Sequence, residues 1–151
     1  MEIRFGTIKD IDLWMQLVDK VKEIFPGLET KEAMDEHRNA VLEFIGREEA
    51  LCVEVDGKIV GVLLFSKEWN KLCFLAVDSM YRRQHIAFKL VNKMYSYLDP
   101  SRDISLETHV EGVLEGVAAR CFYKKLGFIE GAIKEEFGSL VQEFVSPKRE
   151  F

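Results

Sequence analysis

The sequence predicts a single domain of the α/β class, more closely α+β, with a mixed and mostly antiparallel central sheet flanked by helices. The chain has 151 residues, the usual length of one compact domain, so we expect one domain over residues 1–151. Apolar residues recur at helical spacing in some segments and alternate at strand spacing in others. Between two of the alternating segments lies Asp56-Gly57, a favoured hairpin turn, which requires the flanking strands to pair antiparallel.

The N-terminal third predicts a short strand followed by two amphipathic helices. Residues 2–5 alternate like a strand, and Thr7 with Asp10 three positions later forms a helix-capping pattern. Apolar residues then recur at helical spacing until Pro26 ends the first helix. Thr30 is the expected N-cap of the second helix. The stripe of this second helix consists of Met34, His37, Val41, Phe44 and Ile45.

The rest of the chain predicts six strands and two helices. The second arm of the hairpin is apolar on both faces, which indicates a central strand covered on both sides. One helix ends before Pro100 and the other at Gly127, a residue suited to the left-handed position after a helix. The expected elements are strands at 51–55, 59–65 and 72–77, a helix at 86–98, a strand at 104–108, a helix at 117–126, and strands at 128–136 and 139–145. The complete order is β-α-α-β-β-β-α-β-α-β-β, with at least one helical crossover, from Val77 to Ile104.

Charge and hydropathy argue against two classes of partner. With 21 basic and 26 acidic residues the net charge is −5, so we expect no nucleic-acid partner, because such binding relies on Lys and Arg to neutralise phosphates. A small cationic or neutral substrate fits this balance better. The longest apolar run, 59–65, is far shorter than the ~20 residues that span a bilayer, and residues 1–4 do not resemble a signal peptide. We therefore expect no membrane partner and a cytoplasmic location.

The three cysteines are predicted to be reduced thiols packed in the core. They are odd in number, widely spaced and set among apolar neighbours, which is typical of structural thiols and not of disulfides or of a metal centre. They are Cys52, Cys73 and Cys121. No metal site is expected.

The first candidate functional segment is the junction between the strand at 72–77 and the helix after it. A strand-to-helix turn directs free backbone N–H groups outward, where they can bind an anion. The helix dipole opposes positive charge at this place, so Arg82 and Arg83 are unfavourable unless an anion such as a phosphate lies between them. The alternative is that both arginines are solvated or pair with Asp78.

The second candidate segment is the helix at 117–126. Helical spacing places Tyr123 on a largely apolar face with Ala119, Phe122 and Leu126. On the same reasoning, Arg120, Lys124 and Lys125 point elsewhere. Taken alone, a tyrosine on such a face is most often a packing residue.

Together the two segments resemble the GNAT superfamily of N-acetyltransferases. The first is similar to the acetyl-CoA loop of that family, Arg/Gln-x-x-Gly-x-Gly/Ala, at Arg82, Ile86 and Ala87. The second is similar to its late helix motif, Ala-x-x-Phe-Tyr-x-x-x-Gly-Phe, at Ala119, Phe122, Tyr123, Gly127 and Phe128. The order of elements from residue 1 to residue 145 also resembles the family, so the resemblance covers nearly the whole chain.

The resemblance implies an acetyl-CoA-dependent acyltransferase that acetylates a primary amine of a small molecule, or of a peptide, by direct attack. The cofactor pyrophosphate is expected on loop amides, and the pantetheine arm along the backbone of the preceding strand. A backbone N–H near Val77 is expected to polarise the thioester oxygen. The cofactor-binding residues implied are Leu75, Ala76, Val77, Arg82, Arg83, Gln84, His85, Ile86, Ala87 and Phe88.

The resemblance also implies the catalytic groups. Tyr123 is the candidate general acid, because a phenol pKa of ~10 is close enough to a thiol pKa of ~8.5 for proton sharing with the departing thiolate. Family members often carry a Glu on the strand before the loop, but residues 72–77 contain no carboxylate. The base therefore stays open between Glu107, His109 and water, with a solvated strand end as the alternative for both residues.

Two departures from the family pattern affect the expected site. His85 stands where the loop motif has Gly, so it either restricts the backbone or donates a hydrogen bond to the ligand. Gly116 stands where many members carry an Asn that contacts pantetheine. Together with the missing strand carboxylate they favour the alternative function, a non-catalytic module that binds acyl-CoA or a protein partner. The oligomeric state stays open between monomer and homodimer.

Overall fold

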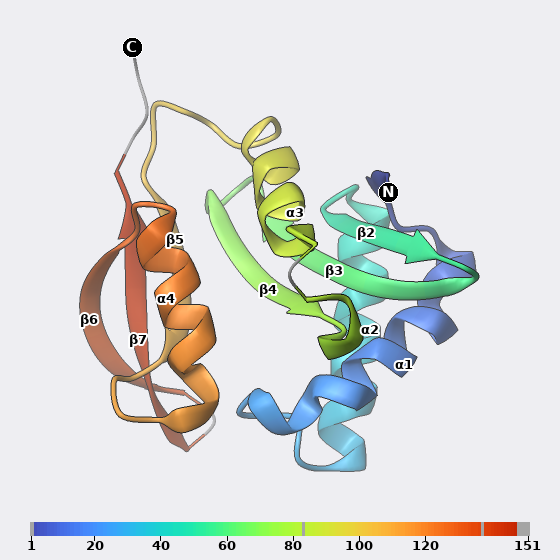
Figure 1. Ribbon diagram of the computed structural model, residues 1–151, viewed down its shortest axis with the longest axis horizontal. Helices are drawn as coiled ribbons and strands as arrows, with labels where there is room; N and C mark the ends of the chain where they lie inside the picture. The colour runs from blue at the N-terminus through green and yellow to red at the C-terminus, as the bar shows by residue number, and fades with distance from the viewer. Residues whose placement is uncertain (1, 83, 137, 148–151) are drawn as a thin grey trace.

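The computed structural model describes residues 2–82, 84–136 and 138–147, and its elements follow the predicted order (Figure 1). The strands are β1 (Ile3–Phe5), β2 (Ala50–Val55), β3 (Lys58–Ser66), β4 (Lys71–Val77), β5 (Ile104–His109), β6 (Ile129–Glu136) and β7 (Ser139–Ser146). The helices are α1 (Ile11–Val21), α2 (Lys31–Gly46), α3 (Ile86–Tyr95) and α4 (Val117–Lys125). Short 3-10 turns accompany them: η1 (Ile8–Asp10), η2 (Lys22–Ile24), η3 (Ser79–Tyr81) and η4 (Leu114–Gly116). The predicted fold class is confirmed.

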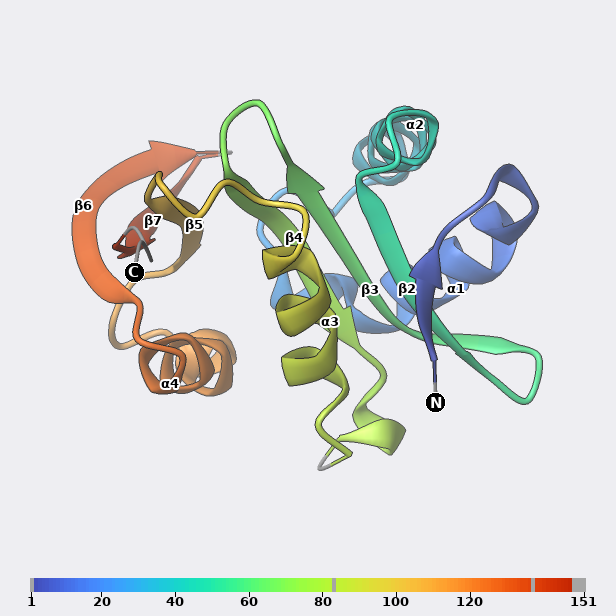
Figure 2. The same cartoon turned by 90° about the horizontal axis from the view of Figure 1, so that it is seen from above.

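The seven described strands form one sheet in the order β1-β2-β3-β4-β5-β7-β6. Every neighbouring pair is antiparallel except β4 and β5, which run parallel and pair at a single position, Lys71 with Ser105, within the described residues. Beyond that position the two strands separate, as Figures 1 and 2 show. The sheet is therefore split into two parts, joined at one end of β4 and β5.

Helices cover both faces of the sheet. Seen from above, α1 and α2 lie on one side of β2 and β3, and α3 lies on the other (Figure 2). Each layer has its own core: α3 packs on Leu63 and Phe65, and α1 packs on Val62 and Leu64. All residues of β3 after Lys58 are buried, which confirms the prediction of a central strand covered on both sides.

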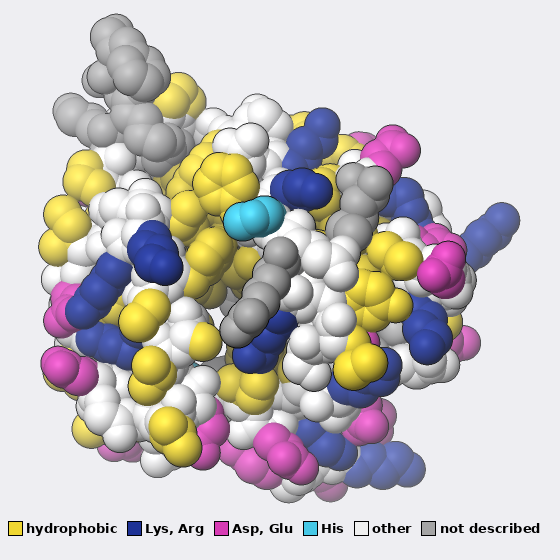
Figure 3. All heavy atoms as spheres, viewed as in Figure 1, with side chains coloured by type: hydrophobic (Ala, Val, Ile, Leu, Met, Phe, Trp, Pro, Cys, Tyr) yellow, Lys and Arg dark blue, Asp and Glu magenta, His cyan; other side chains and the backbone are white. Residues whose placement is uncertain are grey.

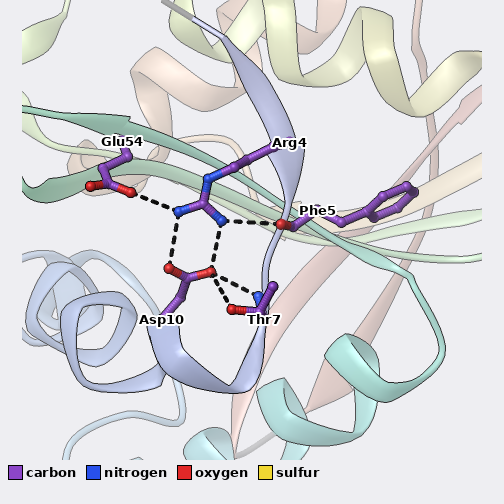
Figure 4. Close-up of polar contacts among 5 residues, drawn as sticks. All are labelled: Arg4, Phe5, Thr7, Asp10 and Glu54. Carbon is purple, nitrogen blue, oxygen red and sulfur yellow. Dashed lines mark hydrogen bonds and ion pairs between the residues drawn. The ribbon is translucent and has the colours of Figure 1, made fainter.

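A polar clamp joins the start of the chain to the sheet (Figure 4). Arg4 donates two hydrogen bonds to Asp10, of 2.8 and 3.0 Å, and one of 2.7 Å to Glu54 on β2. Asp10 also accepts the backbone N–H of Thr7 at 2.8 Å, as the capping pattern predicts. The hydrogen bonds from Arg4 outweigh burial and lower the pKa of Asp10 to about 2.

A second clamp fixes the end at which β4 and β5 meet. Asn70 is fully buried and has a φ of 50°, a conformation that Asn tolerates better than most residues. Its side chain accepts the N–H of Asp99 and donates to the carbonyls of Asp99, Arg102 and Asp103 at 3.0–3.3 Å. One side chain thus holds the loop that leads into β5 against the turn that leads into β4.

The prediction of three packed cysteines is wrong for two of them. All three thiols are free, and Cys52 is buried, but Cys73 and Cys121 are exposed. Both have apolar neighbours in the sequence, yet Cys121 lies on the exposed face of α4 and Cys73 faces an open hollow lined by charged side chains. Apolar neighbours alone therefore did not fix the direction of these side chains.

None of the described helices is long and apolar enough to cross a bilayer.

Candidate active site

Part of the β4 backbone faces the gap between β4 and β5. Asp78 donates its N–H to the carbonyl of Val60 at 2.8 Å, and the register pairs Val77 with Gly61. Because bonded and non-bonded pairs alternate in an antiparallel ladder, Leu75 and Val77 direct their N–H and C=O groups away from β3. Strand β5 has already separated from β4 at this level, so these groups are available to a ligand.

A cleft of about 570 Å³ opens at this gap between α3 and α4. Figure 3 shows apolar side chains gathered between the two helices, with Lys, Arg and a histidine near them. The cleft is lined by eight of the ten residues predicted to bind a cofactor: Leu75, Ala76, Val77, Arg82, His85, Ile86, Ala87 and Phe88. Of the other two, Gln84 is exposed and does not line the cleft, and Arg83 lies outside the described residues.

In the loop before α3 the backbone is left-handed at His85, the position where the loop motif has glycine. His85 is the N-cap of α3 and has φ 59° and ψ 25°, the left-handed conformation that glycine adopts most easily. The first helical hydrogen bond runs from the N–H of Lys89 to the carbonyl of His85. The N–H groups of residues 86–88 therefore have no partner within the helix, which gives the loop free donors for an anion.

Asp78 anchors the start of this loop. Its carboxylate accepts the N–H of Met80 at 3.0 Å and forms an ion pair of 3.1 Å with Lys20 on α1. The hydrogen bond from Met80, aided by Lys20, lowers the pKa of Asp78 against the effect of burial. Among the described residues Asp78 therefore pairs with Lys20 and not with Arg82. The sequence offered one sign of this role, a carboxylate directly after a strand.

Tyr123 lies in the wall that α4 contributes to the cleft. Its ring packs against Phe122, Phe128 and Phe144, with ring centroids 5.6–6.3 Å apart. The residue is 7% exposed, and its hydroxyl makes no hydrogen bond to a described residue. Burial raises the pKa of Tyr123 above its usual value, so the phenol stays neutral and free to donate.

The expectation that Arg120 points away from the buried face of α4 is wrong. Arg120 is 6% exposed and shares that face with Tyr123. It donates to the carbonyl of His109 and to Gln142 on β7, both at 2.8 Å, and pairs with Glu130 on β6 at 3.2 Å. These partners come from three different strands, so helical spacing alone did not reveal them.

Glu107 and His109, the two candidate bases on β5, have different surroundings. Burial disfavours the ionised form of Glu107, but hydrogen bonds from Lys134 and Lys71 outweigh it and lower its pKa. The Nε2 atom of His109 lies 2.5 Å from the carbonyl oxygen of Ile24, which lines the cleft. Glu107 lines a different hollow, described below.

Gly116 is explained by its contact with His109. A Cβ atom at position 116 would lie closer to the His109 side chain than van der Waals contact allows. The glycine that replaces the Asn of the family pattern therefore makes room for a histidine.

In the described part of the chain, no three His, Cys, Asp or Glu side chains are grouped so that they could hold a metal ion.

The chain was compared with known proteins. The model of the "Acetyltransferase (GNAT) family" matches residues 14–128. Ard1 from Thermoplasma volcanium has a similar fold, with a TM-score of 0.75 and 20% identity over 99% of this chain and 98% of that one. An N-acetyltransferase from Staphylococcus aureus Mu50 has a TM-score of 0.73 and 17% identity, over 96% of this chain and 100% of that one. PaiA N-acetyltransferase from Thermoplasma acidophilum, solved in complex with coenzyme A, has a TM-score of 0.67 and 18% identity, over 94% of this chain and 96% of that one.

These structural similarities concern the fold, since all three identities are low. The comparison with curated proteins gave no match. The family model, however, extends over most of the chain and includes β4, the loop and α4. The chain therefore belongs to the GNAT family of acetyltransferases.

Proposed function

We propose that this protein transfers an acetyl group from acetyl-CoA to a primary amine of a small molecule or of a peptide. The observation that carries the proposal is the cleft between α3 and α4. It combines gap-facing backbone groups on β4, a helix N-terminus with free N–H donors, and a buried tyrosine with an unbonded hydroxyl. The coenzyme A bound to PaiA N-acetyltransferase supports the same ligand class here.

Each part of the cofactor has a fitting part of the cleft. The pyrophosphate would accept hydrogen bonds from the N–H groups of residues 86–88, with Arg82 as a positive neighbour. The proposed cofactor-binding loop also includes Arg83, Gln84 and the side chain of His85. The pantetheine arm would run back along Val77 and Leu75 and pair with their backbone as an added strand.

The transfer itself needs a polarised carbonyl and a protonated leaving group. A gap-facing N–H of Val77 or Leu75 polarises the thioester oxygen and stabilises the negative charge that develops on it. The amine nitrogen bonds to the acetyl carbon, the carbon–sulfur bond breaks, and Tyr123 gives its proton to the sulfur. Burial raises the pKa of Tyr123, so the phenol keeps its proton until negative charge develops on the sulfur.

The proton of the amine leaves by another route. The lowered pKa of Glu107 makes this carboxylate a weak base. The contact of His109 with a carbonyl requires a proton on Nε2, so Nδ1 of the neutral ring can accept one. His109, directly or through water, is therefore the base we favour over Glu107.

Two measurements test this function. Isothermal titration should show acetyl-CoA binding, and release of free CoA with a panel of amines should show turnover. The Tyr123→Phe variant should lose about 100-fold in kcat with little change in acetyl-CoA affinity, because only the proton donor is removed. Binding without turnover on any amine would instead support a non-catalytic acyl-CoA-binding module, and an unchanged rate would remove Tyr123 from the mechanism.

A further inference from the structure

A second hollow, of about 650 Å³, lies on the face of the sheet opposite α3. Its walls come from the C-terminal end of α2, the turn between β3 and β4, and strands β4 to β7. Strand β4 connects it with the first cleft, since Cys73 lines the hollow and Leu75 lines the cleft. The hollow therefore lies beside the end of the gap at which the thioester would be placed.

The floor of the hollow holds charged side chains of both signs. Lys71 on β4 and Lys134 on β6 reach the same carboxylate, Glu107, at 2.6 and 2.7 Å. The Glu107 side chain is only 12% exposed, so the three groups form a fixed cluster. Lys134 also lies 4.0 Å from a carboxylate oxygen of Glu136. Because each ammonium group has three N–H donors, donors remain for a further anion.

Arg47 adds a third cation at the wall. Its guanidinium stacks on the Phe44 ring, 4.7 Å from the centroid, and its Nε donates to Glu49 at 2.7 Å. The terminal N–H groups of Arg47 have no partner in the part of the chain that the structure describes. Glu49 is already occupied, because its other oxygen accepts the N–H of Lys67.

Carboxylates face the same hollow. Glu143 is the register partner of Glu107 on β7, and Glu68 lies in the turn before β4. Neither has a hydrogen bond or ion pair to a described residue through its side chain. Glu107, and to a smaller extent Glu143, raise the pKa of Lys134, so carboxylates and ammonium groups lie close together here. A ligand that carries both charges can interact with groups of both signs.

We propose that this hollow binds the acceptor of the acetyl transfer and that the acceptor is an ω-amino acid, with its carboxylate on Lys71, Lys134 and Arg47 and its amine directed toward Leu75. The proposal rests on the function proposed above, which requires an amine. Glu143 supplies a counter-charge for the ammonium form as it enters. Neutral amine then attacks the thioester, and its proton leaves by the route through His109 or water.

The length of β4 sets the length of the acceptor. Lys71 and Leu75 are four residues apart on a strand with a register shift between them, so their Cα atoms lie at most about 13 Å apart. A hydrogen bond of about 3 Å at the carboxylate and an approach of about 3 Å at the amine leave about 7 Å between the two ends. Extended 5-aminopentanoate and 6-aminohexanoate match this span, and glycine and β-alanine are too short.

Steady-state kinetics with matched amines test the proposal. We expect kcat/KM for 5-aminopentanoate to exceed that for pentylamine and for 1,5-diaminopentane by about ten-fold or more, since only the amino acid binds the lysines. Lys134→Gln should remove most of this preference without changing the affinity for acetyl-CoA. Lys125→Gln, an exposed lysine of α4 that lines neither site, is the matched control. A preference for the diamine, or an equal effect of Lys134→Gln on all three amines, would overturn the proposal.

A binding measurement separates this proposal from the proposed function. In ¹⁵N-labelled protein, 5-aminopentanoate should shift the amide signals of Cys73, Glu107 and Lys134, and Lys134→Gln should weaken the effect. Shifts at these residues without acetylation of any amine would support the site while refuting the acetyltransferase function. If acetylation occurs but the amino acid shifts none of these signals, the assignment of the hollow is wrong.

Discussion

Replacing Asp10 by Asn tests how strongly the clamp in Figure 4 stabilises the fold. The hydrogen bonds from Arg4 lower the pKa of Asp10 from its ordinary value of 3.8 to about 2. This lowering corresponds to about 2 kcal/mol of unfolding free energy. Solvent reaches only 10% of the Asp10 side chain but 36% of Arg4, so partial screening makes the value an upper bound.

The sign of the pH dependence follows from the direction of this change. Because the pKa of Asp10 is lower in the folded protein, the stabilisation is present above the unfolded value of 3.8 and is lost as the pH falls through about 2. We expect Asp10→Asn to be less stable than the unmodified chain by up to about 2 kcal/mol at neutral pH. The difference should shrink toward zero as the pH approaches the folded pKa.

Urea unfolding at a series of pH values measures this difference. Trp14 is fully buried in α1 and changes its fluorescence on unfolding, whereas Trp69 is already 69% exposed. Asp12→Asn is the matched control, since the Asp12 side chain is 87% exposed and its ion pair with Arg38 is 3.8 Å long. Equal losses in the two variants at every pH, or a difference that persists at the lowest pH, would refute the reasoning.

Three further predictions concern the site and its support. Arg120→Met should lower the unfolding free energy by about 2–3 kcal/mol in thermal melts, because Gln142 and the carbonyl of His109 lose their donor. The control variant Lys124→Met, on the exposed face of α4, should lower it much less. Asn70→Ala should lower the unfolding free energy by about 2–3 kcal/mol, because the backbone groups that Asn70 binds lose their hydrogen-bond partner. A melting temperature equal to that of the exposed-site variant Asn92→Ala would contradict the role of this clamp. Arg82→Ala should weaken acetyl-CoA binding more in low salt than in high salt, and titrations that show equal losses would argue against a role for its charge.

Local patterns in the sequence were sufficient to predict the elements and their order. Thr30 caps α2 by accepting the N–H of Ala33 at 3.0 Å, and Gly127 follows α4 with a φ of 96°, because capping and turn chemistry depend on neighbours in the chain. The ends of the elements were predicted less accurately than their order. The helix predicted to end at residue 98 ends at Tyr95, and a turn follows in which Leu98 is still buried.

The candidate site was predictable where it is a continuous segment. The strand, the loop and the helix start at residues 75–88 all follow from one stretch of sequence, and nine of its residues line the cleft. The pairing of Asp78 with Lys20 and the cluster of Lys71, Glu107 and Lys134 join elements that are distant in the chain. These contacts depend on strand register and helix packing, which no local periodicity encodes.

The separation of β4 from β5 also bears on how the two parts of the sheet move together. With one paired position between them in the described part of the chain, most of the shared edge has amide groups that can exchange their protons with water. A pantetheine arm in the gap would act as the missing strand and link the N-terminal and C-terminal halves through backbone hydrogen bonds. We expect the amides of Leu75 and Val77 to exchange slowly only when the cofactor is bound, so the ligand becomes a structural member of the sheet.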